Sequence, residues 1–297
     1  MKEKTIYALG FFDGVHIGHA ALLRECRRLA DEHDCTAAVV TFSSHPDTLV
    51  LGKTPKLINT IEDRVRLLKA AGMDDVVVLP FDKAMQTLPW QEFLTLLREH
   101  YGAAGLVCGH DFRFGNRGEG NARLLQDYCK ATGMPCAVVP EQKLHDVTVS
   151  STHIRGLLET GQMEEAARFL GHPHALTGKV VSGRKLGRTL GIPTANLSIP
   201  EEVVSLPFGV YACKAHVAGN EYLAVTNIGN RPTVGGHRIT VEPWLLDFAG
   251  DLYGQELTLC FYRFLRSERK FPSLDALKAE IMKNAAECRK IFENNTK

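Results

Sequence analysis

The spacing of apolar residues changes near residue 172, and this change limits the possible folds more than any other feature of the chain. Up to about residue 140, apolar runs rich in β-branched residues alternate with helical patterns; the runs span residues 5–9, 36–42, 75–79, 106–109 and 136–139. Continuous apolar strands that alternate with helices are typical of a parallel sheet covered on both faces. We therefore expect an α/β domain over residues 1–171, built on a doubly wound parallel sheet.

The second half of the chain shows the alternation typical of antiparallel strands. From Leu176 onward the apolar period is two, with runs over residues 210–217, 221–228, 239–246 and 256–265. In this half of the chain, the first helical pattern begins at Ser273. We expect residues 172–297 to form an antiparallel β-barrel, or a sandwich, with one C-terminal helix. Two domains also agree with the length of 297 residues, which exceeds what one core usually fills.

The composition argues against several classes of protein. There are 35 Lys and Arg against 34 Asp and Glu, so the net charge of +1 offers no basic excess for a nucleic acid or a membrane surface. No signal peptide is apparent, and no apolar stretch approaches the ~18 residues of a membrane span. The eight cysteines form no C-x-x-C pair, which favours buried thiols in a reducing compartment. We expect a cytoplasmic protein with small-molecule partners, and the oligomeric state stays open.

A glycine-rich string follows the first apolar run. It reads Gly-Phe-Phe-Asp-Gly-Val-His-Ile-Gly-His over residues 10–19 and leads into a helix. Glycines let the backbone approach a ligand closely, and the N-terminus of a helix attracts an anion. His16 and His19 lie one turn apart and can donate to phosphoryl oxygens as charge develops. The string predicts a nucleotide-phosphate site; the alternative is a glycine-rich turn capped by solvated histidines.

Polar residues also follow the later strands of this half. His45 comes after the second run, and Asp111 and Phe112 come after the fourth. Because ligands bind beyond the carboxyl ends of parallel strands, one crevice would collect these residues. A helix then opens near Ser151, and Arg155 lies one turn further on. This arrangement predicts a phosphate-binding site that consists of a hydroxyl, a helix N-terminus and a guanidinium. The alternative interpretation is an ordinary capped helix on the surface.

A second glycine-rich segment lies between the first strands of the barrel half. Its glycines are Gly183, Gly187 and Gly191, and the basic residues between them include Lys185 and Arg188. The spacing differs from that of a Walker A loop, but it suits a flexible loop over phosphates. The alternative interpretation is a basic β-turn followed by a strand.

Oxygen-bearing side chains follow this segment. Thr194 and Asn196 come after Pro193 in an extended stretch, so they share a face and offer two neutral oxygens that suit Mg²⁺. Glu242 lies on a later strand, where a carboxylate near a metal-bound nucleotide could take a proton from a hydroxyl nucleophile. By itself, Glu242 could equally be a solvent-facing strand residue.

Taken together, these strings resemble the bacterial bifunctional riboflavin kinase/FMN adenylyltransferase family. The matching stretches appear in the family's order and span residues 12–19, 41–46, 109–115, 150–155, 187–197, 227–233 and 241–248. The resemblance implies that the α/β half transfers AMP from ATP to FMN, giving FAD and pyrophosphate. It also implies that the barrel half phosphorylates riboflavin to FMN with ATP and Mg²⁺.

The resemblance also implies roles for particular residues. The ATP of the adenylyltransferase would be bound by Gly10, Phe12, Asp13, Gly14, His16, His19, Ser151, Thr152 and Arg155, with His16, His19 and Arg155 taking part in catalysis. Its flavin would be bound by His45, Asp111 and Phe112. The ATP of the kinase would be bound by Gly183, Lys185, Gly187, Arg188, Thr194 and Asn196; Thr194 and Asn196 would hold the metal, and Glu242 would be the base.

The chain departs from the family pattern at two places. Phe11 stands where the family commonly has a small polar residue, and Pro243 directly follows the expected base. Two other functions are compatible with the same motifs. One is a nucleotidyltransferase for another phosphorylated acceptor with a regulatory barrel, and the other is a catalytically silent flavin-binding module.

Overall fold

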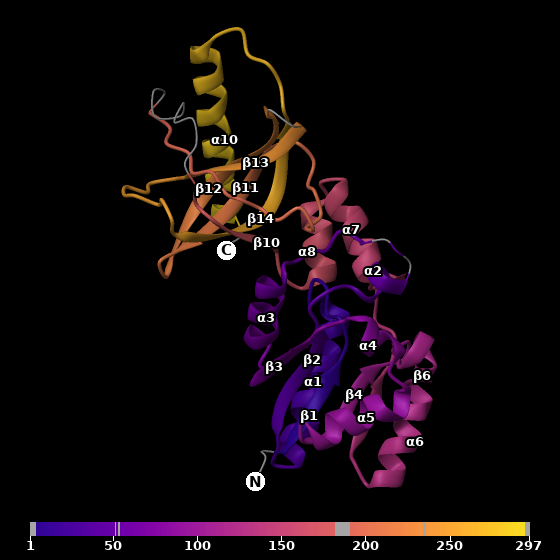
Figure 1. Ribbon diagram of the computed structural model, residues 1–297. Helices are drawn as coiled ribbons and strands as arrows, with labels where there is room; N and C mark the ends of the chain where they lie inside the picture. The colour runs from indigo at the N-terminus through magenta and orange to yellow at the C-terminus, as the bar shows by residue number, and fades with distance from the viewer. Residues whose placement is uncertain (1–3, 51, 53, 182–190, 234–235, 295–297) are drawn as a thin grey trace. The chain divides into compact units, whose positions relative to one another are not determined.

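The computed structural model describes residues 4–50, 52, 54–181, 191–233 and 236–294. The chain divides into two compact units, Met1–Ser151 and Thr152–Lys297 (Figure 1). Among the helices of the described ranges, none is long and apolar enough to cross a membrane.

A five-stranded parallel sheet forms the centre of the first unit. Its strands, in spatial order, are β3 (Asp75–Leu79), β2 (Thr36–Phe42), β1 (Thr5–Leu9), β4 (Ala103–Gly109) and β7 (Cys136–Val139). Every neighbouring pair is parallel. The direction of winding reverses between β1 and β4, so the carboxyl ends of these strands border the crevice where such sheets bind ligands.

Helices cover both faces of this sheet, as the continuous apolar strands predict. The helices are α1 (Ile17–Glu32), α3 (Ile61–Ala70), α5 (Trp90–Glu99) and α6 (Ala122–Thr132). Successive strand residues point to opposite faces. Thus Ile6 and Ala8 pack with α1 and α3, whereas Tyr7 and Leu9 pack with α5 and α6. The expected doubly wound α/β fold is confirmed.

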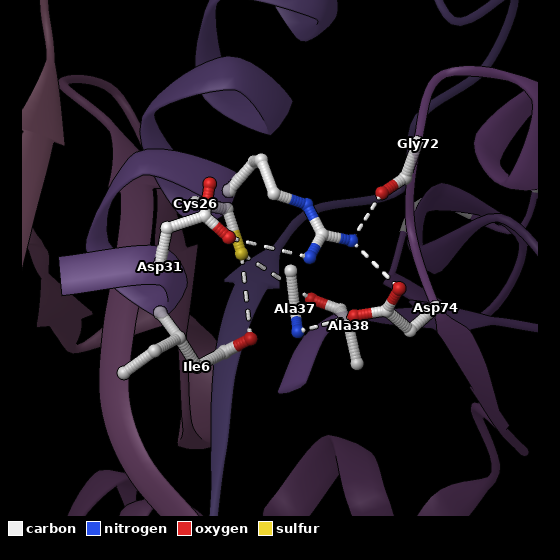
Figure 2. A network of polar contacts seen from close by, with 8 residues as sticks. Ile6, Cys26, Asp31, Ala37, Ala38, Gly72 and Asp74 are labelled. Atoms are coloured by element: carbon white, nitrogen blue, oxygen red, sulfur yellow. Dashed lines mark hydrogen bonds and ion pairs between the residues drawn. The ribbon is translucent and has the colours of Figure 1, made fainter. Parts of the chain in front are cut away.

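Polar contacts attach α1 to the sheet, as Figure 2 shows. Arg27 on α1 forms an ion pair with Asp74, with 2.8 Å between Nη2 and Oδ1. The other carboxylate oxygen of Asp74 accepts a hydrogen bond from the backbone N–H of Ala37 on β2, at 2.9 Å. The thiol of Cys26 donates to the carbonyl oxygen of Ile6. These contacts hold the middle of α1 against β1 and against the residue that precedes β3.

Short elements connect the main ones. They are α2 (Pro46–Val50), α4 (Lys83–Thr87), β5 (Arg113–Phe114), η1 (Asn116–Gly118), β6 (Gly120–Asn121), β8 (Lys143–Leu144) and β9 (Val147–Thr148). Two helices follow, α7 (Ser151–Glu159) and α8 (Met163–Leu170). Glu164 on α8 accepts a hydrogen bond from Nε of Arg263 at 2.7 Å, so α8 packs against the strands of the second unit.

The second unit contains a five-stranded antiparallel sheet. Its strands, in spatial order, are β10 (His174–Lys179), β14 (Glu256–Ser267), β11 (Gly209–Val217), β12 (Asn220–Thr233) and β13 (Gly236–Leu245). Leu197 forms antiparallel bridges to both Val180 and Val241, so it links the end of β10 to β13 and closes the sheet. The C-terminal helix α10 (Leu274–Asn294) packs through Ala285, Cys288 and Phe292 on one side of this sheet. The expected barrel with a terminal helix is confirmed.

Candidate active sites

The glycine-rich string adopts an unusual backbone conformation between β1 and α1. Phe12 and Val15 have φ angles of 60° and 42°, in the left-handed region that disfavours side chains, and Gly14 has a φ of 83°. Phe12 is nonetheless buried. Strained non-glycine residues of this kind persist only where the surroundings hold them, and they concentrate at functional sites.

His16 and His19 form one unit at the start of α1. His16 is the N-cap, and its Nδ1 accepts a hydrogen bond from the backbone N–H of His19 at 3.2 Å. A neutral His16 therefore carries its proton on Nε2. Burial lowers the pKa of His19 well below its ordinary value, and His16 and Arg64 lower it further. His19 therefore stays neutral, and Nε2 is the nitrogen of His16 that is left to donate to a ligand.

A cavity of about 620 Å³ lies at the carboxyl ends of β1, β4 and β7. It is lined by Gly10, Phe12, His16, His19 and Ser151 from the expected nucleotide set. His45, Asp111 and Phe112 from the expected flavin set line the same cavity. The structure thus brings residues from four separate stretches into one crevice, as the strand order requires.

Other predicted residues of this site lie elsewhere. Asp13 is buried under the loop, and its Oδ1 accepts hydrogen bonds from the backbone N–H groups of Ile58 at 2.8 Å and Asn59 at 3.4 Å. The hydroxyl of Ser151 donates to the carbonyl oxygen of Asp13 at 2.8 Å. Asp13 therefore supports the backbone of the loop, and neither Asp13 nor its neighbour Gly14 lies in the cavity wall. Thr152 and Arg155 fall in the second unit, on α7.

A larger cavity of about 970 Å³ adjoins the first, and it was not predicted from the sequence. The two share Phe42, Pro46 and Arg113 in their walls. The larger cavity is mainly aromatic and apolar, with Phe81, Met85, Phe93 and Phe114 in its wall. The stretch over residues 109–115, which contributes Arg113, Phe114 and Gly115 to the wall, was the sequence feature that could have indicated this cavity. Gly115 has a φ of 75°, and a Cβ there would lie 2.6 Å from Trp90, so only glycine fits.

In the second unit, Thr194, Asn196 and Glu242 share one face. The backbone N–H of Ala195 donates to Pro243 O at 2.8 Å, and that of Leu197 donates to Val241 O at 2.9 Å. This antiparallel register sets Asn196 opposite Glu242, with Thr194 diagonal to it. Ala195 and Leu197 point inward and are buried. The predicted oxygen-bearing set is therefore assembled across a strand pair.

Two cavities flank this face. One, of about 740 Å³, has Thr194, Glu242, Asn227 and Trp244 in its wall, together with residues of α10. The other, of about 180 Å³, is lined by Thr194, Pro193, Pro243 and the stretch from Phe248 to Tyr253. Thr194 lies on the wall of both cavities. Asn227, which is paired with Glu242 across β12 and β13, was missed from the sequence.

Gly183, Lys185, Gly187 and Arg188 lie outside the described residues.

Comparisons with known proteins match both units in order. A family model described as FAD synthetase matches residues 1–153, and one described as riboflavin kinase matches residues 170–292. The bifunctional riboflavin kinase/FMN adenylyltransferase of Bacillus subtilis is 35% identical and aligns over 99% of this chain and 94% of its own length. The Escherichia coli K12 protein of the same name is 36% identical, over 98% of this chain and 94% of its own.

One solved structure also matches along nearly the whole chain. It is described as a macrolide-efflux protein from Streptococcus pneumoniae, is 29% identical, and superposes with a TM-score of 0.87 over 97% of this chain and 95% of its own. The fold and these matches together define a class of protein. Its members have an α/β unit of the nucleotidyltransferase type, followed by a closed antiparallel barrel. The chain belongs to the bifunctional riboflavin kinase/FMN adenylyltransferase family.

Proposed function

We propose that this protein carries out two consecutive reactions: it phosphorylates riboflavin to FMN with ATP, and it adenylylates FMN to FAD with release of pyrophosphate. One observation carries this proposal. Each unit has its own set of cavities, and each unit matches the family model for one of the two activities. We assign adenylyl transfer to residues 1–171 and phosphorylation to residues 172–297.

In adenylyl transfer, a phosphate oxygen of FMN attacks the α-phosphorus of ATP, and pyrophosphate leaves. The N-terminus of α1 and the N–H donors of His16 and His19 stabilise the charge that develops on the phosphoryl oxygens. We assign Gly10, Phe12 and Gly14 to the loop beneath the triphosphate, which Asp13 holds in shape. The helix start at Ser151 and Thr152, with the guanidinium of Arg155, supplies the remaining neutralisation.

The flavin of this reaction would occupy the adjoining aromatic cavity. Its apolar wall suits a flat tricyclic ring, which buries most of its surface in such sites. His45, Asp111 and Phe112 lie in the smaller cavity, toward the histidine pair. We place the ring in the larger cavity and the FMN phosphate in the smaller one.

In phosphorylation, Glu242 takes the proton of the terminal ribityl hydroxyl while that oxygen attacks the γ-phosphorus of ATP; the bond from the γ-phosphorus to the β–γ bridging oxygen breaks, and ADP leaves. The side chain of Thr194 is exposed and that of Asn196 is half-buried. Asn196 lies opposite Glu242, and Thr194 lies diagonal to it. These neutral oxygens fit Mg²⁺, which would neutralise phosphate charge when it is bound. The cavity of about 740 Å³ would hold riboflavin, and the nucleotide would lie on the other side of Thr194.

Three further expectations belong to this proposal. Gly183, Lys185, Gly187 and Arg188 are proposed to bind the kinase nucleotide. The location is proposed to be cytoplasmic, because all eight cysteines are free thiols, as expected in a reducing compartment. The near-neutral charge favours small molecules over nucleic acid as partners.

One assay tests both activities. Purified protein is incubated with ATP and Mg²⁺ and with either riboflavin or FMN, and the flavins are separated by chromatography. Riboflavin should yield FMN and then FAD, and FMN should yield FAD with stoichiometric pyrophosphate. Binding of flavin without turnover would contradict the proposal, and so would adenylylation of another phosphorylated acceptor in preference to FMN.

A further inference from the structure

A buried guanidinium lies behind the histidine cavity, and the reaction as proposed above does not use it. Arg64 on α3 is 1% exposed. Its Nη1 donates to the carbonyl oxygen of Phe11 and its Nη2 to that of Phe42, both at 2.8 Å. We propose that Arg64, together with Phe11, is a positioning residue for adenylyl transfer: it fixes the loop after β1, at Phe11, to the end of β2, at Phe42, and both residues line the cavity. This inference rests on the assignment of that cavity to adenylyl transfer.

The contact to Phe11 controls the conformation of the phosphate loop. The carbonyl oxygen of Phe11 also accepts a hydrogen bond from the hydroxyl of Thr41 at 2.9 Å, so two donors hold one peptide group. The next residue is Phe12, whose φ of 60° requires support from outside. The ring of Phe12 contacts that of His19, with centroids 5.1 Å apart. A shift of this peptide would therefore move the catalytic histidine.

The guanidinium also orders the side chains of the cavity wall. It stacks over the ring of Phe11, with 4.1 Å between Cζ and the ring centroid. The ring of Phe11 in turn meets that of His45 edge-on, with centroids 4.6 Å apart. Phe11, Phe42 and His45 all line the cavity. The aromatic residue at position 11, where the family commonly has a small polar one, thus has a partner that uses its ring.

The energetics favour a functional reason for this charge. Burial lowers the pKa of Arg64 to about 10, while Asp13 raises it, so the group stays charged at neutral pH. Its Nε has no hydrogen-bond partner among the residues that the structure describes. A buried charge with an unused donor contributes less to stability than a well-packed apolar residue would. The arrangement instead gives two fixed backbone carbonyls at the rim of a ligand site.

The experiment compares Arg64→Met, Arg64→Lys and Phe11→Leu with a matched control, Arg66→Met. Arg66 lies on the same helix, is 45% exposed and pairs with Asp63. For each variant, kcat and KM for ATP and FMN are measured in FAD formation, alongside the thermal midpoint. Arg64→Met should lower kcat about 10- to 100-fold with smaller changes in KM, because small misplacements at a reacting centre have effects of this size. Arg64→Lys should recover part of kcat, since one ammonium can hold one carbonyl.

The outcomes separate this inference from the site assignment. Phe11→Leu keeps the backbone carbonyl and removes only the stacked ring, so it should lower kcat less than Arg64→Met does. If Arg64→Met does not fold, Arg64→Lys and Phe11→Leu decide, and a wild-type kcat in both overturns the proposal. If His16→Asn abolishes FAD formation while the Arg64 variants keep wild-type kcat, only the role of Arg64 is wrong. If His16→Asn also forms FAD normally, the assignment of the cavity is wrong, and this inference with it.

Discussion

The rings of His16 and His19 stack face to face, with centroids 3.5 Å apart and planes 12° from parallel. Two imidazolium ions would repel each other strongly at this separation, so the stack favours neutral rings. The pKa of His19, lowered by burial and then by His16 and Arg64, agrees with this state. The two rings are therefore not both charged, and the neutral ring of His19 avoids the desolvation cost of a buried charge.

The first prediction separates the proposed catalytic role of His16 from its role as a helix cap. Asparagine is a good N-cap, so His16→Asn should keep α1 and the thermal midpoint. It removes the Nε2–H donor, and loss of one such donor typically costs about 10² to 10³ in rate. FAD formation from FMN should fall by that factor while FMN formation from riboflavin continues. Equal rates of FAD formation in the variant and the wild type would exclude His16 from catalysis.

The second prediction concerns the neutral oxygens on the barrel face. Thr194→Val and Asn196→Leu keep approximate volume but remove the oxygens proposed to hold Mg²⁺. Both should raise the Mg²⁺ concentration needed for half-maximal FMN formation, and Thr194→Ser should restore it because the hydroxyl returns. A magnesium titration of each variant measures this. Unchanged magnesium curves for both variants would mean that the extended stretch is only structural.

The third prediction concerns Glu242, the proposed base of the kinase reaction. Glu242→Gln keeps the size and polarity of the side chain but cannot take a proton, and general-base catalysis typically contributes about 10² to 10⁴ in rate. FMN formation should fall within that range, whereas FAD formation from supplied FMN should not change. Glu221→Gln is the control, since Glu221 is an exposed carboxylate on the neighbouring strand β12. A loss equal to that of the control would rule out Glu242 as the base.

The fourth prediction concerns pH and stability. His174 is 1% exposed, and neither ring nitrogen has a hydrogen-bond partner among the described residues. Burial, and then His172, lowers its pKa to about 3. Between pH ~6.5 and ~3 the unfolded chain therefore binds a proton that the folded chain does not. The free energy of unfolding should fall as pH decreases through this window, by at most about 1.4 kcal/mol per pH unit.

His174→Leu should flatten this dependence. Urea unfolding at several pH values from 7 to about 4 measures the slope, with the exposed His216→Gln as the control. Identical slopes for wild type and His174→Leu would show that His174 already finds a partner in the folded state.

The architecture could be predicted because it depends on apolar periodicity, which is local in the chain. The predicted cavity residues follow from strand order in the same way, since His45 and Asp111 directly follow strands that end at one edge. Arg64 could not be predicted from such a pattern. It occurs among Glu62, Asp63 and Arg66, and a run of this kind usually forms a solvated helix face.

The role of Asp13 could not be predicted from a local sequence pattern either. Its place in the glycine-rich string suggested a ligand contact, but its Oδ1 accepts hydrogen bonds from backbone groups more than forty residues away. Periodicity contains no information on such a pairing. The position of Asn196 opposite Glu242 likewise depends on a strand register that only the closed barrel defines.

The place of Thr194 on the wall of two cavities has a thermodynamic consequence. If one ligand shifts this residue and the other ligand binds its two positions with different affinity, the binding of the two ligands is coupled, and reciprocity requires the same factor in both directions. Binding of riboflavin and of nucleotide would then be cooperative without any large rearrangement of the barrel. Either ligand could then bind first, and the concentrations of the two ligands would decide which one does. The first ligand to bind would shift Thr194 and so raise the affinity for the second.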